Sequence, residues 1–533
     1  MRMSNLEKLV HSSYEDLFGI NSEGAIYDDP SHITGLLSPR IIDESTLFAI
    51  DVKDLFTAIN HTRTRTGAAT LFRSLVNPLN SLELILEKQN SLKELEKDGK
   101  KREALNGYLN SLAKREQYVH RYLFQCSYSQ NEPYNLRFVD QYKLYHESTE
   151  FFKNMVDGVK DLPSLESPYI RILIEDIRSI DEKRAFELIK GPVYKTLGGL
   201  KTKKEVRIYT PRVKFTLRSF KPTLAIPYVA FLLLAFVEPL QIPAVSGVVA
   251  YTPIIYGFPE AFDRRYFVSP LKEIYKEDPD ISRGIEALGM IDELMSFYDY
   301  SKAMGKDMIL PTMINANKHH FVATKVRNPI LAKGNPDYVP NDVNLKEHRL
   351  AIITGANSGG KTTYCKTIAQ MQLLAQIGCY VPAEEAELSI ADRILYQAPT
   401  FDSIRDAEGR FGTELERTRD IFFKATPRSL VILDELAEAT TYEEKMEISY
   451  VILNGFNRIG SDTILVTHNH ELARRLQQEG KSQNLQVEFK NRKPTYKITL
   501  GISKMSHAEL IAEKVGFSSR DIDSYLKRKG YSE

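Results

Sequence analysis

The chain has 533 residues, of which 42% are hydrophobic and 26% are charged, and its formal net charge at pH 7 is +1. This length exceeds what one hydrophobic core supports, so we expect two to four domains, and the balanced charge excludes a general attraction to polyanions. Three widely spaced cysteines, Cys126, Cys365 and Cys379, form neither a disulfide framework nor a metal-binding pattern. They indicate a reducing compartment, and the polar N-terminal stretch lacks the apolar core of a secretory signal.

The region after residue 40 has the pattern of amphipathic helices. Between residues 80 and 120, apolar residues recur at steps of three and four, with charged residues between them. We interpret these charges as a solvated helix face. Residues 279–304 predict another long helix, which returns to the same domain.

A basic stretch precedes a long apolar stretch in the middle of the chain. Residues 222–259 contain one charged residue, Glu238. Residues 190–221 contain one acid, Glu205, against ten basic residues: Lys190, Lys195, Lys201, Lys203, Lys204, Arg207, Arg212, Lys214, Arg218 and Lys221.

Two interpretations of this insert remain open. A membrane-crossing helix needs about 20 apolar residues, so residues 222–259 are long enough for two crossings, or for a shallower re-entrant anchor. Basic residues on both sides would then face the cytoplasm. The other interpretation is a soluble insert that buries apolar strands while its basic stretch grips a phosphate backbone. Six prolines in the apolar stretch disfavour regular helices, but so many nearly uncharged residues without alternation favour the membrane.

A glycine-rich loop follows the apolar run RLAIIT. The stretch GANSGGKTT fits the pattern G-x-x-x-x-G-K-[ST] and lies between an expected strand and an expected helix. Backbone N–H groups of such a loop surround phosphates; Lys361 would reach the β- and γ-phosphates, and the Thr362 hydroxyl would ligate Mg²⁺. We therefore expect ATP and Mg²⁺ as cofactors. The expected nucleotide-binding residues are Gly355, Ala356, Asn357, Ser358, Gly359, Gly360, Lys361, Thr362 and Thr363.

Two later strands end in residues suited to hydrolysis. The run SLVILDE ends in Asp434, which can hold Mg²⁺, and Glu435, which can orient or deprotonate a water molecule. The run TILVTH ends in His468, where a histidine can sense the γ-phosphate. We expect Thr362 and Asp434 to hold the metal, and Glu435, His468 and Lys361 to be catalytic. This order of motifs is typical of ABC-type ATPases, whose sites form between two chains.

The stretches around these motifs resemble the MutS family of DNA mismatch-repair ATPases, over about residues 40–190 and 320–522. The stretches that carry the resemblance are residues 42–79, YVPNDVNL (338–345), GCYVPAEEAELSIADRI (378–394), FGTELERTRDIFFKATPRSLVILDE (411–435) and SKMSHAELIAEKVGFSSRDI (503–522). The resemblance implies a homodimer in which ATP moves helical levers that close on DNA. It assigns Tyr338 to stacking on adenine and Gly409, Arg410 and Phe411 to a signature loop that contacts the partner's nucleotide.

Several residues depart from the family's pattern. Ala356 and Ser358 stand where the family usually has Pro and Met. The signature loop usually reads Ser-Thr-Phe, so the serine that caps the opposite γ-phosphate is absent, and Arg410 is a candidate to replace it in trans. Glu438 places an acid in the turn after Glu435, where the family has a basic residue.

The resemblance does not extend to a mismatch-reading domain. Family members begin with such a domain, which carries a Phe-x-Glu wedge, and with a connector, whereas about 40 residues precede the helical core here. The match FVE at 236–238 lies within the apolar run, and we attribute it to chance. We therefore expect branched or recombining DNA, or DNA held at a membrane, as the ligand rather than a simple mispair.

The prediction is a multidomain protein with an α-helical core or lever domain and a C-terminal α/β P-loop ATPase domain of ABC type. The expected function is ATP-dependent DNA binding in a homodimer. The alternative is a membrane-tethered ABC-like ATPase that acts on protein or RNA. We expect a cytoplasmic protein, attached to the inner face of the membrane if residues 222–259 contact lipid. The expected boundaries are 1–40 N-terminal extension, 41–190 lever, 191–270 insert, 271–320 returning lever helices, 321–500 ATPase domain and 501–533 C-terminal helical dimerisation segment.

Overall fold

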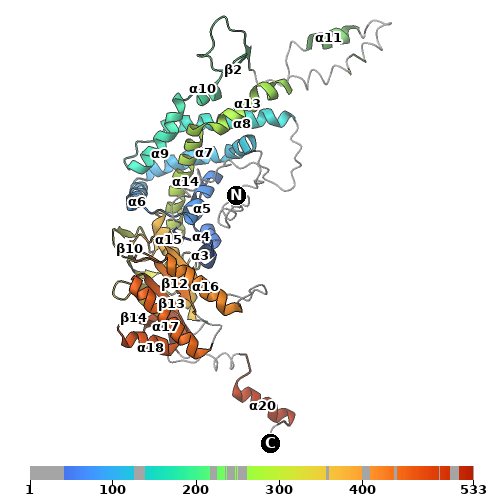
Figure 1. The fold of residues 1–533 in the computed structure, drawn as a ribbon. Helices are drawn as coiled ribbons and strands as arrows, with labels where there is room; N and C mark the ends of the chain where they lie inside the picture. The colour runs from blue at the N-terminus through green and yellow to red at the C-terminus, as the bar shows by residue number, and fades with distance from the viewer. Residues whose placement is uncertain are drawn as a thin grey trace. The chain divides into compact units, whose positions relative to one another are not determined.

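The structure is a computed structural model in which the chain divides into two compact units (Figure 1). One, here called the helical unit, contains Thr62–Leu71 and Lys93–Met295. The other, the sheet unit, contains Phe72–Leu92, Ser296–Glu533 and the described residues up to His61. The described residues are 41–124, 138–215, 225–234, 236, 246–247, 249, 261–305, 307–355, 359–398, 409–436, 441–490, 493–503 and 515–531.

Long helices dominate the helical unit, as the spacing of apolar residues predicts. Helices α5, α6 and α14 each have residues in both units. The elements are α5 (Arg65–Val76), α6 (Leu82–Lys97), α7 (Gly99–Phe124), α8 (Phe138–Lys160), α9 (Pro168–Ser179), η2 (Ile180–Glu182), α10 (Arg184–Lys190), β1 (Tyr194–Thr196), β2 (Gly199–Lys201), β3 (Val213–Lys214), α11 (Ala225–Leu234), η5 (Arg264–Val268), α13 (Ser269–Glu277) and α14 (Pro279–Met304).

Helices α7 and α8 form the largest helix pair of this unit. Leu109 of α7 and Phe152 of α8 are fully buried, and the Tyr108 hydroxyl of α7 donates to the Met155 carbonyl of α8 at 2.8 Å. Gly158 permits this approach, since a Cβ there would lie 2.9 Å from the Tyr108 ring. The helix predicted at 279–304 is confirmed as α14, which buries Leu288 and Ile291.

Two buried carboxylates hold the start of α5. Asp292 accepts from the backbone N–H groups of Arg63 and Thr64 at 2.9 and 2.7 Å. Glu116 accepts from the N–H groups of Arg65 and Thr66 at 2.7 and 2.8 Å. These contacts satisfy donors that a helix start otherwise leaves unpaired. Gly67 lets Asp292 come close, since a Cβ there would lie 2.3 Å from a carboxylate oxygen.

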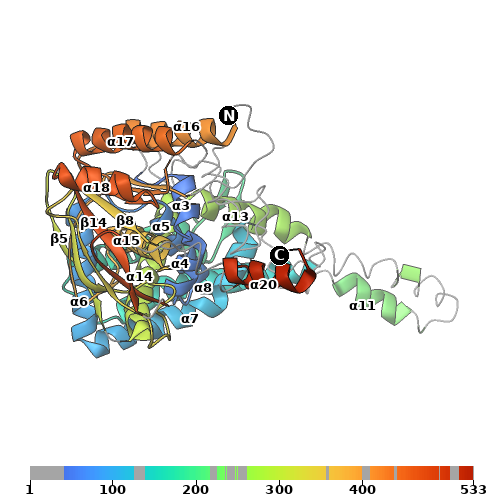
Figure 2. The same ribbon diagram turned by 90° about the horizontal axis from the view of Figure 1, so that it is seen from below.

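The sheet unit combines a six-stranded sheet with helices on both faces (Figure 2). Its elements, besides parts of α5, α6 and α14, are α3 (Glu44–Ala49), α4 (Val52–Ile59), β4 (Met308–Ile309), β5 (Thr312–Ile314), β6 (Phe321–Val326), β7 (Asn341–Asn344), β8 (Leu350–Thr354), α15 (Lys361–Gln376), β9 (Val381–Pro382), β10 (Glu385–Ser389), β11 (Ile394–Gln397), α16 (Gly409–Lys424), β12 (Leu430–Asp434), α17 (Tyr442–Ile459), β13 (Asp462–Val466), α18 (His470–Gln478), β14 (Ser482–Lys490), β15 (Lys493–Leu500) and α20 (Ser519–Lys529).

The order of the large sheet is β11-β12-β13-β8-β14-β15, with only the last pair antiparallel. Strands β8, β12 and β13 are buried along their whole length, which explains their continuous apolar runs. Helices α16, α17 and α18 bury Ile421, Phe456 and Leu472 against one face. Helix α15 contacts β12 and β13 and covers the other. The expected α/β architecture is therefore confirmed, and the carboxyl ends of parallel strands meet at one edge, where such sheets bind ligands.

The apolar stretch 222–259, predicted as a candidate membrane hairpin, contains helix α11 in its described part. No described helix is long and apolar enough to cross a membrane. Helix α11 (Ala225–Leu234) is bordered on both sides by residues outside the described part of the chain. Except for residues 225–234, 236, 246–247 and 249, the stretch 222–259 lies outside the described residues. The basic stretch before it includes the antiparallel strands β1, β2 and β3.

Candidate functional site

The predicted phosphate loop lies between β8 and α15. Gly355 and Gly360 have φ values of +129° and +84°, in the region that favours glycine. A Cβ on Gly359 would lie 2.8 Å from the Val487 side chain of β14, so the loop needs glycine there as well. No side chain caps α15, so its first N–H groups remain available to an anion. Ala356, Asn357 and Ser358 lie outside the described residues.

Lys361 is the first residue of α15, and its side chain is almost completely buried. Its Nζ donates to the Gly355 carbonyl at 2.5 Å, across the loop. Burial lowers the pKa of Lys361 to about 8, and the nearby charges of Glu435 and Asp434 oppose this shift. The ammonium group thus lies at the loop, where a bound anion would raise the pKa of Lys361 and so favour its charged form.

Thr362 and Asp434 meet at the ends of α15 and β12. The Thr362 hydroxyl hydrogen-bonds to the Asp434 carboxyl, which is buried, and burial raises the pKa of Asp434. The Tyr396 hydroxyl also contacts this carboxyl, at 3.4 Å. In the described part of the chain, no three His, Cys, Asp or Glu side chains cluster to hold a metal. A hydroxyl with one carboxylate nevertheless suits Mg²⁺, which keeps several waters and completes its shell with phosphate oxygens.

The side chains of Glu435 and His468 are in contact. His468 Nε2 lies 3.3 Å from Glu435 Oε1, and the Glu435 side chain is 13% exposed. Burial raises the pKa of Glu435, but the hydrogen bond and charge of His468 outweigh it, so the pKa is lowered overall. The φ of Glu435 is +68°, which is strained for a residue other than glycine. Backbone strain of this kind is concentrated at functional sites.

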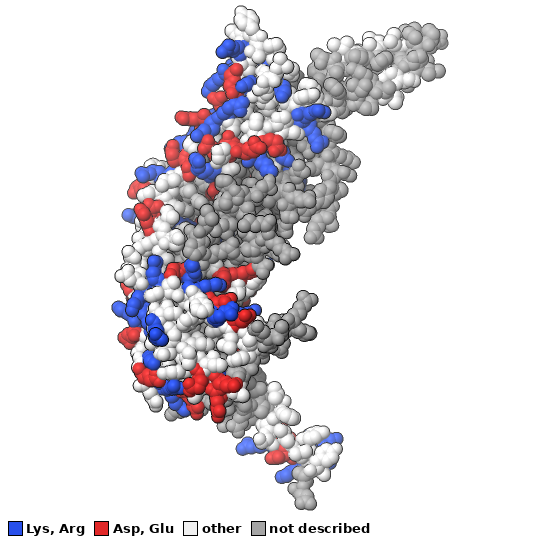
Figure 3. All heavy atoms as spheres, in the orientation of Figure 1, with Lys and Arg blue, Asp and Glu red and all other residues white. Residues whose placement is uncertain are grey.

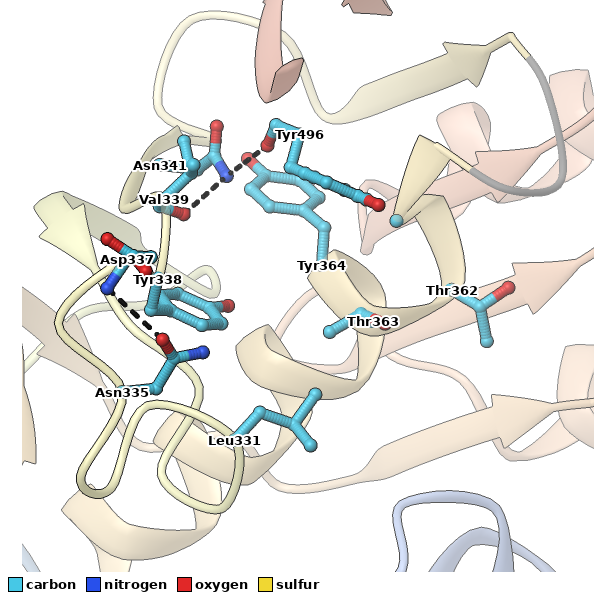
Figure 4. A pocket seen from close by; sticks show the side chains of 11 residues that line it. Leu331, Asn335, Asp337, Tyr338, Val339, Asn341, Thr362, Thr363, Tyr364 and Tyr496 are labelled. Carbon is cyan, nitrogen blue, oxygen red and sulfur yellow. Dashed lines mark hydrogen bonds between the residues drawn. The ribbon is translucent and has the colours of Figure 1, made fainter. Parts of the chain in front are cut away.

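A cavity of about 510 Å³ opens beside the start of α15 (Figure 4). Tyr338, which the sequence predicts here, lines it from the loop before β7, together with Gly360, Thr362 and Thr363. The Tyr338 hydroxyl hydrogen-bonds to the Thr367 side chain of α15, which fixes the ring in place.

Tyr496 also lines this cavity, and sequence reasoning missed it. It lies in β15, is 54% exposed and has a φ of +60°. The Asn341 side chain supports this backbone, since its Nδ2 donates to the Tyr496 carbonyl at 3.0 Å and its Oδ1 accepts from Ile498 N at 2.7 Å. Asn341 lies in the run YVPNDVNL, but nothing in that run points to a residue 155 positions later.

The predicted signature loop lies elsewhere in the same chain. Gly409, Arg410 and Phe411 form the first turn of α16, and Phe411 does not line the cavity. The Phe411 side chain is partly buried and packs against the hydrophobic core to which α16 and α17 contribute.

Comparison with known proteins agrees with the resemblance read from the motifs. Residues 351–524, from the second residue of β8 into α20, match the family model described as MutS domain V. The chain therefore contains a domain of the MutS family. Among its relatives, the DNA mismatch repair protein MutS of Brevibacillus brevis is 32% identical over 211 residues, which are 39% of this chain and 24% of that protein.

The similarity extends to eukaryotic members of the MutS family. The DNA mismatch repair protein Msh3 of Homo sapiens is 38% identical over 194 residues, which are 35% of this chain and 17% of the relative. The corresponding protein MSH3 of Kluyveromyces lactis is 39% identical over 142 residues, which are 26% of this chain and 14% of the relative. The chain thus spans a quarter or less of the length of these three relatives.

Proposed function

We propose that the chain is an ATP-dependent DNA-binding protein of the MutS type, in which ATP binding and hydrolysis drive closure of a homodimer. The observation that carries this proposal is the meeting of three features at one edge of the sheet. These are the phosphate loop, the contact of Thr362 with Asp434, and the pair of Glu435 and His468. Each feature alone can be explained by the stability of the fold. Together they would bind phosphate, coordinate a metal ion and activate a water molecule.

The nucleotide would lie along the start of α15. Its phosphates would meet the loop backbone, the α15 N-terminus and the Lys361 ammonium. Its base would enter the cavity between Tyr338 and Tyr496, since aromatic rings stack on any nucleobase.

Glu435 is the candidate for positioning and deprotonating the attacking water. His468 lowers the pKa of the Glu435 carboxyl and so keeps it ionised and able to accept a proton. Thr362 and Asp434 would hold Mg²⁺, which supplies positive charge to the phosphate oxygens when bound. His468 is 42% exposed, which leaves it accessible to the γ-phosphate.

A second copy of the chain would complete each site. In this proposal Gly409, Arg410 and Phe411 of one copy face the nucleotide of the other, and Arg410 supplies charge in place of the family's serine. The proposed dimer contact includes residues 501–533. Binding of ATP would close the dimer, and this closure would bring the long helices of the helical unit against DNA.

The other candidate function is a membrane-tethered ABC-like ATPase that acts on protein or RNA. The exposed apolar side chains of α11 favour it, because a soluble DNA-binding protein has no need of them. DNA is preferred as the ligand because the relatives named above are mismatch repair proteins.

Turnover of ATP by the purified chain tests the proposal. We expect turnover to change when branched or mismatched DNA is added, and DNA affinity to fall steeply with salt, because phosphate contacts release counterions. Glu435→Gln should lower turnover by about 100-fold or more while ATP still binds. The proposal would be wrong about DNA if no DNA changed the rate of ATP turnover and if the chain did not bind DNA at low salt. That outcome would favour the membrane-tethered ATPase instead.

A further inference from the structure

Tyr396 is a buried residue of β11, the strand that pairs with β12. Its side chain is 2% exposed, and β11 is buried along its whole length. A buried tyrosine hydroxyl lowers the stability of a fold unless it has a hydrogen-bond partner. The Tyr396 hydroxyl donates to Asp434 Oδ2 at 3.4 Å, which is a long hydrogen bond. Its partner is thus the carboxyl that is proposed to hold Mg²⁺.

The pairing of β11 with β12 explains how Tyr396 reaches Asp434. The two strands are parallel, and Tyr396 lies opposite Ile432. Successive side chains of a strand point to opposite faces, so Asp434 is the next residue after Ile432 on the same face. Leu395 and Leu433, on the other face, pack in the core to which α16, α17 and α18 contribute. Tyr396 and Asp434 therefore share the face that α15 covers (Figure 2).

Contacts on both sides of Tyr396 fix its place in the sheet unit. Its backbone N–H donates to the Thr46 hydroxyl of α3 at 3.0 Å. The side chain of the next residue, Gln397, accepts from the Thr418 hydroxyl of α16 at 2.9 Å. Since α3 and α16 both hold β11, the Tyr396 hydroxyl stays beside the Asp434 carboxyl.

The Tyr396 hydroxyl keeps its proton at neutral pH. Burial raises the pKa of this side chain well above its ordinary value. A protonated phenol donates a hydrogen bond, which an ionised carboxylate accepts. The Thr362 hydroxyl also hydrogen-bonds to Asp434, so groups from α15 and from β11 both restrain the carboxyl.

We propose that Tyr396 is a positioning residue for Mg²⁺ and acts through Asp434, whose carboxyl it holds in a fixed orientation. The inference rests on the proposed function, because that function requires the metal. Tyr396 does not line the nucleotide cavity, so its effect on the metal passes through the carboxyl. Loss of such a partner of a metal-binding side chain typically lowers metal affinity by about 10- to 100-fold.

The variant Tyr396→Phe removes the hydroxyl and keeps the ring. Tyr450→Phe is the matched control, because the Tyr450 hydroxyl also donates to a carboxylate of the sheet unit, that of Glu479, at 2.9 Å. Equilibrium dialysis of a non-hydrolysable ATP analogue, over a series of Mg²⁺ concentrations and in EDTA, measures nucleotide binding by each full-length chain. Electron paramagnetic resonance of Mn²⁺ measures metal binding directly, without turnover.

Acidic side chains on the surface of the sheet unit, red in Figure 3, can also bind Mn²⁺ weakly. The variant Asp434→Asn is therefore the reference, because it removes the proposed metal ligand and leaves the surface acids in place. The double variant, Tyr396→Phe with Asp434→Asn, tests whether the two residues act together.

We expect Tyr396→Phe to weaken metal binding about tenfold, at the lower end of the usual range because the hydrogen bond is long. Its binding of nucleotide in EDTA should match that of the parent chain. Tyr450→Phe should leave both measurements unchanged. In the Asp434→Asn chain, the further change Tyr396→Phe should have no effect on metal binding.

Three results would overturn the inference. The first is a Tyr396→Phe chain that binds metal as tightly as the parent. The second is an equal loss of nucleotide binding with Mg²⁺ and in EDTA, which would mean that the hydroxyl only supports the fold. The third is a further loss of metal affinity when Tyr396→Phe is added to Asp434→Asn. A parent chain whose nucleotide binding does not respond to Mg²⁺ would instead contradict the proposed function, and this inference with it.

Discussion

At the scale of single residues, Lys361 combines burial with a contact to the Gly355 carbonyl. Because the pKa of Lys361 is lowered to about 8, its amine is neutral in about half of the molecules at pH 8. A polyphosphate beside the amine favours the charged form and therefore raises the pKa. Binding of nucleotide and uptake of a proton are thus linked at this residue.

Binding of ATP with Mg²⁺ at pH 8 should take up about half a proton per site, and affinity should fall by up to about tenfold per pH unit above 8. Calorimetric titrations in buffers of different ionisation enthalpy measure this uptake. Lys366→Met is the control, because Lys366 lies in the same helix but pairs with Asp51, and it should behave as the parent. Binding heats that do not depend on the buffer at pH 8 would contradict this role of Lys361.

Tyr496→Ala should weaken ATP binding by about 1–3 kcal/mol, the contribution of one aromatic ring stacked on a base. Tyr496→Phe should retain affinity, because the ring remains. Tyr496→Gly separates the ring from the backbone, since glycine adopts the φ of +60° without strain. Equilibrium dialysis of nucleotide measures all three, and an alanine variant that binds as tightly as the parent would exclude Tyr496 from the base site.

The sequence located the candidate residues Asp434 and Glu435 more readily than it located the residues that line the cavity. Asp434 and Glu435 were recognisable because the continuous apolar run of a buried strand shows in the sequence where that strand ends. Tyr496 was not, because its place depends on the pairing of β14 with β8 and of β15 with β14. Pairings between distant strands leave no local pattern in the sequence.

At the scale of elements, Gly67 decides how closely α5 approaches Asp292. Gly67→Ala should destabilise the protein by about 1–3 kcal/mol, because the added Cβ meets a buried carboxylate that is already holding the helix start. Gly107→Ala in α7 is the matched control. A Cβ at Gly107 meets nothing within 4 Å, so alanine there should stabilise the helix by up to about 1 kcal/mol.

Thermal unfolding of the two glycine variants measures this difference. If Gly67→Ala unfolded at the same temperature as Gly107→Ala, the Asp292 carboxylate would have moved aside without loss of stability, and the prediction would be wrong.

Helices with a regular apolar spacing were predictable from the sequence, and α14 begins and ends where its pattern does. The apolar stretch 222–259 was harder, because composition alone does not determine where a helix ends. Its six prolines interrupt any regular apolar pattern.

At the scale of the whole molecule, the proposed mechanism requires two copies of the chain. In this proposal the sheet unit would supply a phosphate loop, a metal-binding pair (Thr362 and Asp434) and a water-activating pair (Glu435 and His468). In the proposed dimer, Gly409, Arg410 and Phe411 of one copy face the γ-phosphate bound to the other copy. A nucleotide held between two copies would therefore join them, and its hydrolysis would release them.

Sedimentation of the Glu435→Gln chain with ATP and Mg²⁺ tests this central claim most directly, because the variant should bind nucleotide without hydrolysing it. We predict a dimer with ATP and a shift toward monomer with ADP, together with a parent turnover per chain that rises with chain concentration until the dimer saturates. A variant that remains a monomer at saturating ATP, while the parent hydrolyses ATP at a rate per chain independent of concentration, would contradict it.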